Sequence, residues 1–318
     1  MYDVVALGEL LIDFTPYGES ENGNILFERN PGGAPANVLA MLGRLGLKTS
    51  FITKVGADKF GEFLKDTLIA QNIDTSGLVF TEKVNTTLAF VHLHPDGDRS
   101  FSFYRNPGAD LTLELSEVKM ELIEKAKVFH FGSLSMTSEP SRQATIGAVQ
   151  YAKEKGLLIT YDPNLRKSLW NDLEEAKRMI SEGLHYADVV KLSEEELHFL
   201  TDTMDFGAGS EFLMKKYGIS LMFVTLGEKG CFYRYKDTTG VIPGYQEEAV
   251  DTTGAGDAFF GAAIYKLLEQ SIVNLDIKKL DTIVRFANAA GALATTKKGG
   301  IPSLPTLADI HQLLEGMK

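Results

Sequence analysis

One short run of glycines and acids could carry out chemistry on a phosphate group. Asp251-Thr-Thr-Gly-Ala-Gly-Asp257 leads directly into an apolar helical pattern from Ala258 to Leu267. The unpaired amides and the positive dipole at such a helix start favour a bound anion. Asp257 would repel a phosphate unless it takes a proton from the group that attacks it. The alternative is a glycine-rich turn before an amphipathic helix, with Asp257 as an ordinary first-turn acid.

Two other nucleotide-binding motifs are absent from the sequence. A dinucleotide fingerprint that began at Gly254 would need a glycine where Phe259 stands. The spacing from Gly56 to Gly61 is close to that of a P-loop, but Glu62 follows it in place of Lys-Ser/Thr. A nicotinamide dehydrogenase is therefore disfavoured.

Residues suited to a hydroxyl-rich ligand lie near the start of the chain. In Asn30-Pro-Gly-Gly-Ala-Pro-Ala-Asn37, Gly32 and Gly33 allow close approach of the backbone, and the Asn37 amide both donates and accepts hydrogen bonds. Asp13 follows the first expected strand, where ligands of α/β sheets bind. A capped turn at each place is the alternative.

Two arginines follow expected strands and could contact a substrate. Arg105 ends an expected hairpin, which would act as a lid that excludes water from a phosphoryl donor. The aromatic residues before it could also form a simple strand face. Arg166, in Tyr161-Asp-Pro-Asn-Leu-Arg166, either binds a sugar oxygen or a phosphate, or pairs with Asp162.

Three further segments have both a functional and a structural interpretation. Thr225-Leu-Gly-Glu-Lys-Gly230 suits a nucleotide phosphate or ribose, or is a plain β-turn. The segment from Ala294 to Ser303 could hold a hard cation through oxygen ligands, or is a glycine cap before a proline. His92 and His94 share a strand face, and without a third ligand this pattern favours a hairpin face over a metal site.

The elements that must position these residues alternate along the chain. We expect strands at Val4–Gly8, Ser50–Val55, Val128–Gly132, Leu157–Asp162, Val189–Leu192 and Leu221–Leu226. We expect helices at Ala36–Leu45, Phe60–Ala70, Ser141–Lys155, Leu173–His185, Glu211–Tyr217, Ala258–Gln270, Leu280–Thr295 and Ala308–Gly316. This alternation predicts parallel βαβ units in a doubly wound α/β sheet, with ligands at the carboxyl ends of the strands.

One segment departs from this alternation and predicts a small second sheet. Residues 86–94 and 99–105 show alternating apolar side chains around a Pro-Asp-Gly turn, which is typical of a β-hairpin. Together with Phe14–Phe27 the hairpin would project from the main body. We therefore expect one domain over residues 1–318, with a lid formed by segments about 12–29 and 86–106.

Composition narrows the classes of partner. The net charge of −11 argues against a nucleic-acid or anionic-membrane surface, so a phosphorylated ligand would need a locally positive pocket. Cys231 is the only cysteine and cannot form an intramolecular disulfide, which indicates a reducing cytoplasm. No signal peptide or membrane-spanning segment is expected.

Gly32-Gly33-Ala-Pro-Ala-Asn37 and Asp251-Thr-Thr-Gly-Ala-Gly-Asp257 together resemble the two signature regions of the PfkB/ribokinase-like carbohydrate kinases. The motifs occur in the same order, and the resemblance covers essentially the whole chain. Phe103-Tyr-Arg-Asn-Pro-Gly-Ala-Asp110 and Asp162-Pro-Asn-Leu-Arg-Lys-Ser-Leu-Trp170 look more narrowly like the fructokinase branch. The resemblance implies a three-layer α/β/α sandwich with a mainly parallel sheet, a β lid, and ATP-dependent phosphorylation of a sugar hydroxyl with Mg²⁺ and K⁺.

The resemblance also implies roles for individual residues. Asp257 would be the base, with an anion hole at Gly254, Ala255 and Gly256. Asp13, Gly32, Gly33, Asn37, Arg105, Arg166 and Asp257 would bind the sugar. Lys191, Ser193, Glu196, Thr225, Gly227, Gly230, Gly254, Gly256 and Asn288 would bind the nucleotide. Asp251, Thr253, Ala294, Lys297, Gly299 and Ser303 would hold the monovalent cation.

One position departs from the family pattern. The family's Asn-x-x-Glu element is Ser193-Glu-Glu-Glu196 in this chain, which weakens the expectation that Glu196 places Mg²⁺ through water.

We expect a cytoplasmic fructokinase that forms a homodimer through its lids. A 2-keto-3-deoxygluconate kinase is the alternative within the class, because Arg105 and Arg166 could pair with a carboxylate. Another sugar or nucleoside kinase, or a non-catalytic sensing module, also stays open.

Overall fold

The computed structural model describes residues 1–93, 99–270 and 272–316. The turn of the expected hairpin, with His94, lies outside the described residues.

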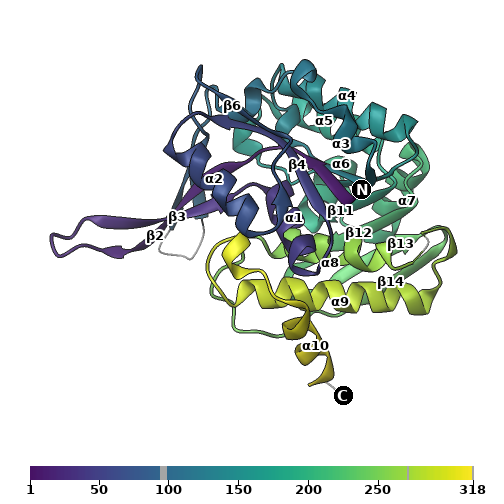
Figure 1. Cartoon of the computed structure of the whole chain (residues 1–318). Coiled ribbons are helices and arrows are strands. Elements are labelled where there is room, and N and C mark those ends of the chain that lie inside the picture. The colour runs from purple at the N-terminus through teal and green to yellow at the C-terminus, as the bar shows by residue number, and fades with distance from the viewer. Residues whose placement is uncertain (94–98, 271, 317–318) are drawn as a thin grey trace.

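A large twisted sheet forms the centre of the protein (Figure 1). In the described residues it has ten strands, in the order β14-β13-β12-β11-β10-β9-β1-β4-β5, with β6 paired to β4. The strands are β1 (Tyr2–Leu7), β4 (Thr49–Gly56), β5 (Ile73–Asp74), β6 (Leu78–Thr81), β9 (Ala126–Gly132), β10 (Leu158–Asp162), β11 (Val189–Ser193), β12 (Leu221–Thr225), β13 (Cys231–Tyr235) and β14 (Thr238–Ile242). All pairings are parallel except β12–β13 and β13–β14.

Helices cover both faces of this sheet and make three layers (Figure 1). The first face packs against α1 (Ala34–Arg44), α2 (Lys59–Ala70), α8 (Ala255–Leu268), α9 (Ile277–Thr295) and α10 (Leu307–Glu315). The second packs against α3 (Met120–Ile123), α4 (Ser141–Glu154), α5 (Leu173–Leu184), α6 (Glu194–Thr201) and α7 (Phe206–Tyr217). Short 3₁₀ turns occur at Ala109–Thr112, Leu115–Glu117, Leu134–Met136, Lys167–Leu169, Gly227–Lys229, Ile272–Asn274 and Ile301–Ser303.

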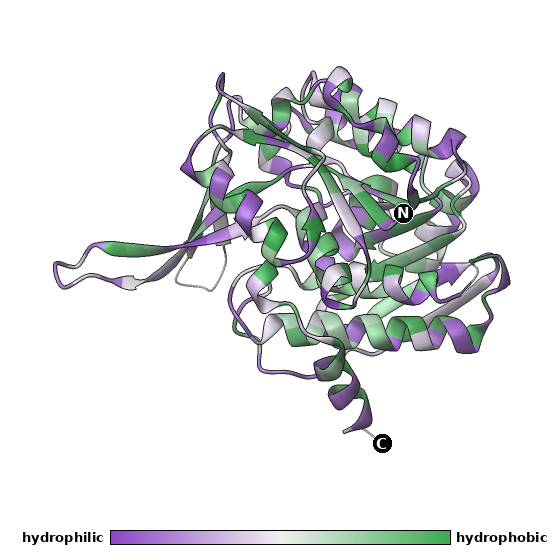
Figure 2. Cartoon of the chain, in the orientation of Figure 1, coloured by the Kyte–Doolittle hydropathy of each residue, from purple (hydrophilic) through white to green (hydrophobic). Residues whose placement is uncertain are grey.

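The strand sequences account for two separate cores. Val4 and Ala6 of β1 belong to the first cluster, whereas Val5 and Leu7 belong to the second. Successive side chains of a strand point to opposite faces, so a continuous apolar run fills both layers. Figure 2 shows the hydrophobic colour concentrated on the strands and on the inward faces of the helices.

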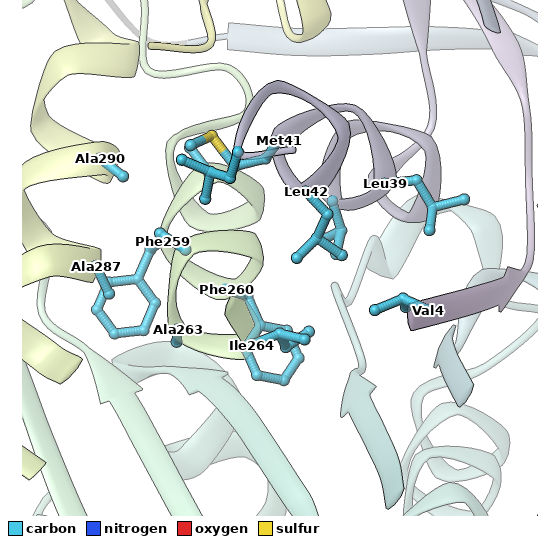
Figure 3. Packing of buried hydrophobic residues seen from close by; sticks show 14 of the residues in the cluster. Val4, Leu39, Met41, Leu42, Phe259, Phe260, Ala263, Ile264, Ala287 and Ala290 are labelled. Atoms are coloured by element: carbon cyan, nitrogen blue, oxygen red, sulfur yellow. The ribbon is translucent and has the colours of Figure 1, made fainter. Parts of the chain in front are cut away.

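Helix α8, which carries Asp257, is packed between two other helices of the first layer (Figure 3). Phe260 and Ile264 of α8 face Leu42 of α1, while Phe259 lies beside Ala287 of α9. Residues of all three helices at this contact are almost fully buried. This packing restricts movement of the helix start, where the predicted chemistry takes place.

A second, four-stranded sheet has the order β3-β2-β7-β8 and projects from one end of the main body (Figure 1). Its strands are β2 (Leu11–Glu19), β3 (Ile25–Gly32), β7 (Leu88–Leu93) and β8 (Arg99–Tyr104). Strands β7 and β8 are antiparallel, as the alternating pattern predicts, and β2 pairs with β7 in parallel. We call this sheet the lid.

The expected doubly wound α/β fold with a small separate sheet is confirmed. Strands β5, β6, β13 and β14 and helices α3 and α6 were not expected from the sequence. Strands β13 and β14 extend one edge of the main sheet. None of the described helices is long and apolar enough to cross a membrane.

Candidate active site

Asp257 lies in the first turn of α8, because the helix begins at Ala255, three residues before the expected start at Ala258. The helix begins at Ala255 because Gly254 takes a left-handed conformation (φ 78°) at the N-cap. A Cβ at Gly254 would come within 3.1 Å of Gly300 Cα. The first-turn amides of α8 therefore begin at this glycine turn, where the sequence predicts an anion site, and the Ala255 N–H donates to the Thr252 carbonyl at 3.3 Å.

The Asp257 carboxylate is buried and held in place. Its Oδ2 accepts a hydrogen bond of 2.7 Å from Asn37 Nδ2. Burial is the largest cause that raises the pKa of Asp257 to about 6, and the neighbouring Asp162 carboxylate raises it further. The Asn37 hydrogen bond and the charges of Lys191 and Arg166 oppose this shift. A carboxylate with a pKa near 6 is ionised at neutral pH and still accepts a proton readily.

A cavity of about 330 Å³ opens at Asp257 on the side of the lid. Asp13, Gly33, Asn37 and Arg166 line it, as do Gly254 and Gly256. The structure thus brings together residues from the lid, from α1 and from the loop after β10 that are far apart in sequence. We call this space the lid-side cavity.

The backbone at Gly32 and Gly33, in the wall of the lid-side cavity, leaves no room for a side chain. Gly33 has a φ of 116°, and a Cβ there would meet the Glu9 carbonyl oxygen at 2.4 Å. Gly32 lies directly behind Asp13, whose Oδ2 is 2.1 Å from the position a Gly32 Cβ would take. Larger residues would therefore displace Asp13 or the turn that leads into α1.

Asp13 adds a second carboxyl with altered acidity. Its pKa is raised to about 7, mainly because the group is shielded from water. Arg166 lowers the pKa of Asp13, whereas the charges of Asp251 and Asp257 raise it. Two carboxyls with raised pKa values facing one cavity are suited to the hydroxyls of a neutral ligand.

Arg166 and Lys191 supply positive charge at the same cavity. Lys191 Nζ lies 2.8 Å from Asp162 Oδ2, and both side chains are buried. Asp162 therefore pairs with Lys191, and Arg166 is an exposed side chain on the cavity wall. Of the two interpretations of Arg166, the structure favours a contact with a ligand over an ion pair with Asp162.

A second cavity of about 430 Å³ lies on the other side of the α8 start. Thr225, Gly227, Gly230 and Asn288 line it. The Asn288 amide donates 3.1 Å hydrogen bonds to the carbonyls of Ile242 and Pro243, which fixes the loop after β14. We call this space the β12-side cavity.

The two cavities share Thr252 and Gly256 in their walls. Ala255 faces only the β12-side cavity, and Asp257 only the lid-side cavity. A group that bridges the two cavities must therefore pass the amides at the start of α8, with the Asp257 carboxylate on its lid side. This arrangement fits transfer of an anionic group from one ligand to another.

The loop expected to hold a monovalent cation is partly assembled around Asp251. Its Oδ1 accepts the Thr253 N–H at 2.8 Å and its Oδ2 accepts the Gly299 N–H at 2.9 Å. Lys297 and Ser303 instead line a different cavity beside α10, and Ala294 is buried in the first core. Carbonyl and carboxylate oxygens in this loop are the donor type a hard cation needs, and the cation site formed by the six expected residues stays a prediction.

Ser193 and Glu196 are not among the described residues that line either cavity. They form a capping box at the start of α6, in which Glu196 Oε2 accepts the Ser193 N–H at 2.7 Å. Glu196 Oε1 accepts the Leu165 N–H at 2.7 Å, so this carboxylate positions the loop that carries Arg166. Both oxygens are in use, and the expected water-mediated contact with Mg²⁺ stays a prediction.

Arg105 is not among the described residues that line the lid-side cavity, in contrast to the expected substrate contact. Its Nε and Nη2 donate to Asp110 Oδ2 at 2.9 and 2.6 Å, and both side chains are almost fully buried. Nη2 also donates to the Leu134 carbonyl and Nη1 to Thr137. The position of Arg105 at the end of a lid strand predicted a contact with a ligand, but its guanidinium instead pairs with Asp110, five positions later in the chain.

Several wall residues were not identified from the sequence. Glu9 lines the lid-side cavity, and Tyr245 and Phe259 line the β12-side cavity. Asn164, in the turn after β10 that also carries Arg166, lines the lid-side cavity as well. Tyr245 lies in an irregular segment before Asp251, where no periodic pattern indicates which side chains turn inward.

With this geometry in place, comparisons with known proteins identify the family. Residues 1–307 match the pfkB family of carbohydrate kinases. Fructokinase-1 of Zea mays is 46% identical over 98% of this chain and 97% of its own length. Probable fructokinase-3 of Arabidopsis thaliana is 44% identical over 99% of this chain and 92% of its own length. The chain belongs to the pfkB family of carbohydrate kinases.

Solved structures agree with this assignment. A fructokinase from Xylella fastidiosa with bound ATP has a TM-score of 0.91 at 32% identity, covering 100% of this chain and 99% of that one. A fructokinase double mutant from Vibrio cholerae O395, in a form with fructose, ADP and potassium ion bound, has a TM-score of 0.89 at 35% identity, covering 98% of both chains. The architecture is the ribokinase-like α/β sandwich, also seen in a putative ribokinase II from E. coli (TM-score 0.89, 28% identity, covering 99% of this chain and 100% of that one).

Proposed function

We propose that this protein is a fructokinase that transfers the terminal phosphoryl group of ATP to a hydroxyl of D-fructose, giving ADP and fructose 6-phosphate. The observation that carries the proposal is the meeting of two cavities at Thr252 and Gly256, beside the buried Asp257. The lid-side cavity takes the sugar and the β12-side cavity takes the nucleotide. Fructokinases that match nearly the full chain support this choice of substrate.

The chemistry follows from the position of each group. Asp257 takes the proton of the attacking hydroxyl, whose oxygen forms a bond to the terminal phosphorus as the bond to the ADP oxygen breaks. Amides at the start of α8, from the predicted anion hole at Gly254, Ala255 and Gly256, stabilise the charge on the transferred group. Lys191 lies on the cavity wall, where its ammonium adds positive charge. Mg²⁺ bound together with the nucleotide would neutralise part of the phosphate charge.

The charges of the lid-side cavity favour a neutral sugar over a sugar acid. Its wall carries the carboxyls of Glu9, Asp13 and Asp257. Of the two arginines that a keto-acid substrate could use, Arg105 is committed to Asp110, so Arg166 alone faces the cavity. A bound carboxylate would meet the three carboxyls as well as the cations Arg166 and Lys191, whereas hydroxyls can pair with all of these groups. This contrast argues against a 2-keto-3-deoxygluconate kinase.

The test is an assay of ADP release, coupled to a fluorescent or absorbing readout, with fructose, 2-keto-3-deoxygluconate, ribose and adenosine as acceptors. We expect fructose to give the highest kcat/KM. Preference for the keto acid or for adenosine would reject the fructokinase assignment within the family. Sugar binding without ADP formation from any acceptor would favour a non-catalytic sensing module.

The monovalent cation and the assembly are further parts of the proposal. We propose that oxygen atoms of Asp251, Thr253, Ala294, Lys297, Gly299 and Ser303 hold K⁺, as supported by the oxygen-rich loop that Asp251 joins to the α8 start. The protein forms a homodimer through its lids and works in the cytoplasm. The lid's exposed apolar side chains support the dimer, and the lone cysteine is compatible with a reducing compartment.

A further inference from the structure

Glu9 is a buried acid on the wall of the lid-side cavity. It lies between β1 and β2, and its exposed fraction is only 2%. It shares the cavity wall with Gly33 and Asn37, but the proposed transfer reaction gives it no role. Acids rarely occupy such buried positions without a partner for each oxygen.

The two carboxyl oxygens of Glu9 are in different situations. Oε1 accepts the Ala34 N–H at 3.0 Å and so holds the first residue of α1 beside the glycine turn. Oε2 is buried and has no hydrogen-bond partner among the residues that the structure describes. Burial is the largest cause that raises the pKa of Glu9 to about 7; hydrogen bonds from backbone amides and the charge of Arg105 oppose the shift. An unpaired buried oxygen of this kind destabilises the fold, and a ligand that donates a hydrogen bond to it would remove that cost.

Arg105, whose charge lowers the pKa of Glu9, does not donate a hydrogen bond to this oxygen. Arg105 influences Glu9 electrostatically, but its guanidinium donates to Asp110, Leu134 and Thr137. Asp110 also accepts a hydrogen bond from the Thr87 hydroxyl, so both of its carboxylate oxygens have partners within the Arg105–Asp110 cluster. Glu9 Oε2 therefore has no hydrogen-bond partner among the described residues, while Glu9 itself belongs to the cavity wall.

We infer that Glu9 Oε2 binds one hydroxyl of the sugar, other than the hydroxyl that is phosphorylated. This inference rests on the proposed function, because it assigns the sugar to the lid-side cavity. A hydroxyl fits this position better than an anion, because it can donate to a carboxylate and accept from a protonated acid. Glu9 then joins the sugar to the turn at Ala34 and sets which hydroxyls the substrate must carry.

The experiment is a kinetic comparison of fructose with a panel of deoxyfructoses, each lacking one hydroxyl other than the phosphorylated one. We expect wild-type kcat/KM to fall about 10- to 100-fold for the analogue that lacks the Glu9 partner, as for a lost hydrogen bond to a charged group. In Glu9→Gln, which keeps an acceptor for Ala34, that penalty should shrink at least about fivefold, since the uncharged amide binds a hydroxyl less strongly. Penalties for the other analogues should stay unchanged.

A matched control separates this role from a general loss of an acid. Glu117 pairs with Lys54 outside both cavities, and Glu117→Gln should leave every analogue penalty as in the wild type. If Glu9 only supports the glycine turn, Glu9→Gln will change kcat/KM by the same factor for fructose and for every analogue, and the inference is overturned. Unchanged penalties across the panel would overturn it equally.

The design also separates this inference from the proposed function. If fructose is not phosphorylated by the wild type, the fructokinase proposal fails, and the deoxy panel is built on whichever acceptor the ADP-release assay identifies. Thermal unfolding of Glu9→Gln shows whether the variant folds. Should it not fold, Glu9→Asp withdraws the carboxyl from the sugar while keeping its charge, and the same single analogue should lose its penalty.

Discussion

Asp257, the proposed base, is a side chain whose burial as a carboxylate is costly for the fold. Burial raises its pKa to about 6 from 3.8, so the folded protein favours the protonated form more than the unfolded chain does. The stabilising contribution of that proton is fully present below pH 3.8 and is lost as the pH rises through about 6. At neutral pH the ionised carboxylate therefore reduces the free energy of unfolding.

We predict that Asp257→Asn raises the free energy of unfolding at pH 8 by up to about 3 kcal/mol, because the buried charge is removed. At pH 4 the gain should nearly vanish. Urea unfolding at both pH values measures the difference. Asp66→Asn, on the exposed surface of α2, is the control and should change stability little at either pH. An equal gain at pH 4 and pH 8 would contradict the linkage.

A second prediction at this scale concerns the Arg105–Asp110 pair. Arg105→Gln alone leaves a buried carboxylate without its cation and should cost about 3–5 kcal/mol. The double variant Arg105→Gln/Asp110→Asn should recover most of this stability and keep the KM for fructose within about threefold of the wild type. Chemical unfolding and steady-state kinetics test both parts. A large rise in KM for the double variant would show that Arg105 contacts the sugar, as the sequence suggested.

At the scale of elements, the start of α8 is positioned by packing on two sides. Its apolar face is enclosed by α1 and α9 (Figure 3), and α1 also supplies Asn37, the hydrogen-bond donor to Asp257. The same contact therefore sets the distance between the Asn37 amide, proposed to bind the sugar, and Asp257, the proposed base. The loop before α8 is fixed separately, through Asp251 and its bonds to Thr253 and Gly299.

Alanine substitutions at Gly254 and Gly46 test the role of the glycine turn at the start of α8. Both have a left-handed φ, but a Cβ at Gly46 meets nothing within 4 Å, whereas one at Gly254 lies 3.1 Å from Gly300 Cα. We predict that each change to alanine costs about 1–2 kcal/mol of stability. Only Gly254→Ala should also lower kcat, by about tenfold or more, because it displaces the anion site. Equal kcat values in the two variants would argue against a role for this turn.

The elements that the sequence predicts correctly are those with a strong periodic pattern. Strands β1 and β9 and helices α4 and α5 agree with the expected ranges to within about two residues, since long apolar patterns leave little choice. Helix α6 carried a usable signal in its capping box, Ser193 followed by Glu196, which was assigned to a phosphate role instead. Strands β13 and β14 depend on pairing with β12, which local sequence does not specify.

The site was predictable to the extent that it follows from motifs. Asp13, Asn37, Arg166 and Asp257 all face one cavity, as expected of residues near strand ends and at a helix start. Arg105 shows the limit of that reasoning. Its partner Asp110 is close in sequence, but the sequence does not show whether the two side chains point toward each other. Glu9 offered no motif, and its importance comes from a hydrogen-bonding position that only the packed structure reveals.

At the scale of the whole molecule, the lid has two faces with different surroundings. One side contributes Asp13 and Phe103 to the cavity wall. Other lid side chains are exposed, with exposed fractions of 64% for Tyr17, 62% for Ile25 and 67% for Tyr104. Figure 1 shows the β2–β3 hairpin extending away from the main body. A projecting sheet with exposed apolar side chains is typical of a pairing surface.

We predict a dimer of the wild type in sedimentation equilibrium and a shift to monomer in Ile25→Lys, because a charge at the lid surface opposes pairing. Ile277→Lys is the matched control, since Ile277 is similarly exposed but lies on α9, and it should leave the dimer intact. A wild type that sediments only as a monomer would contradict the proposed assembly.

The central claim is that Asp257 removes the proton from the sugar hydroxyl. The most direct measurement is ADP release from saturating ATP and fructose by Asp257→Asn, with nucleotide affinity measured on the same protein by calorimetry. We predict a loss in kcat of about 10²- to 10⁴-fold, as for removal of a general base, with the affinity for ATP retained. Turnover at the wild-type rate in this variant would contradict the claim.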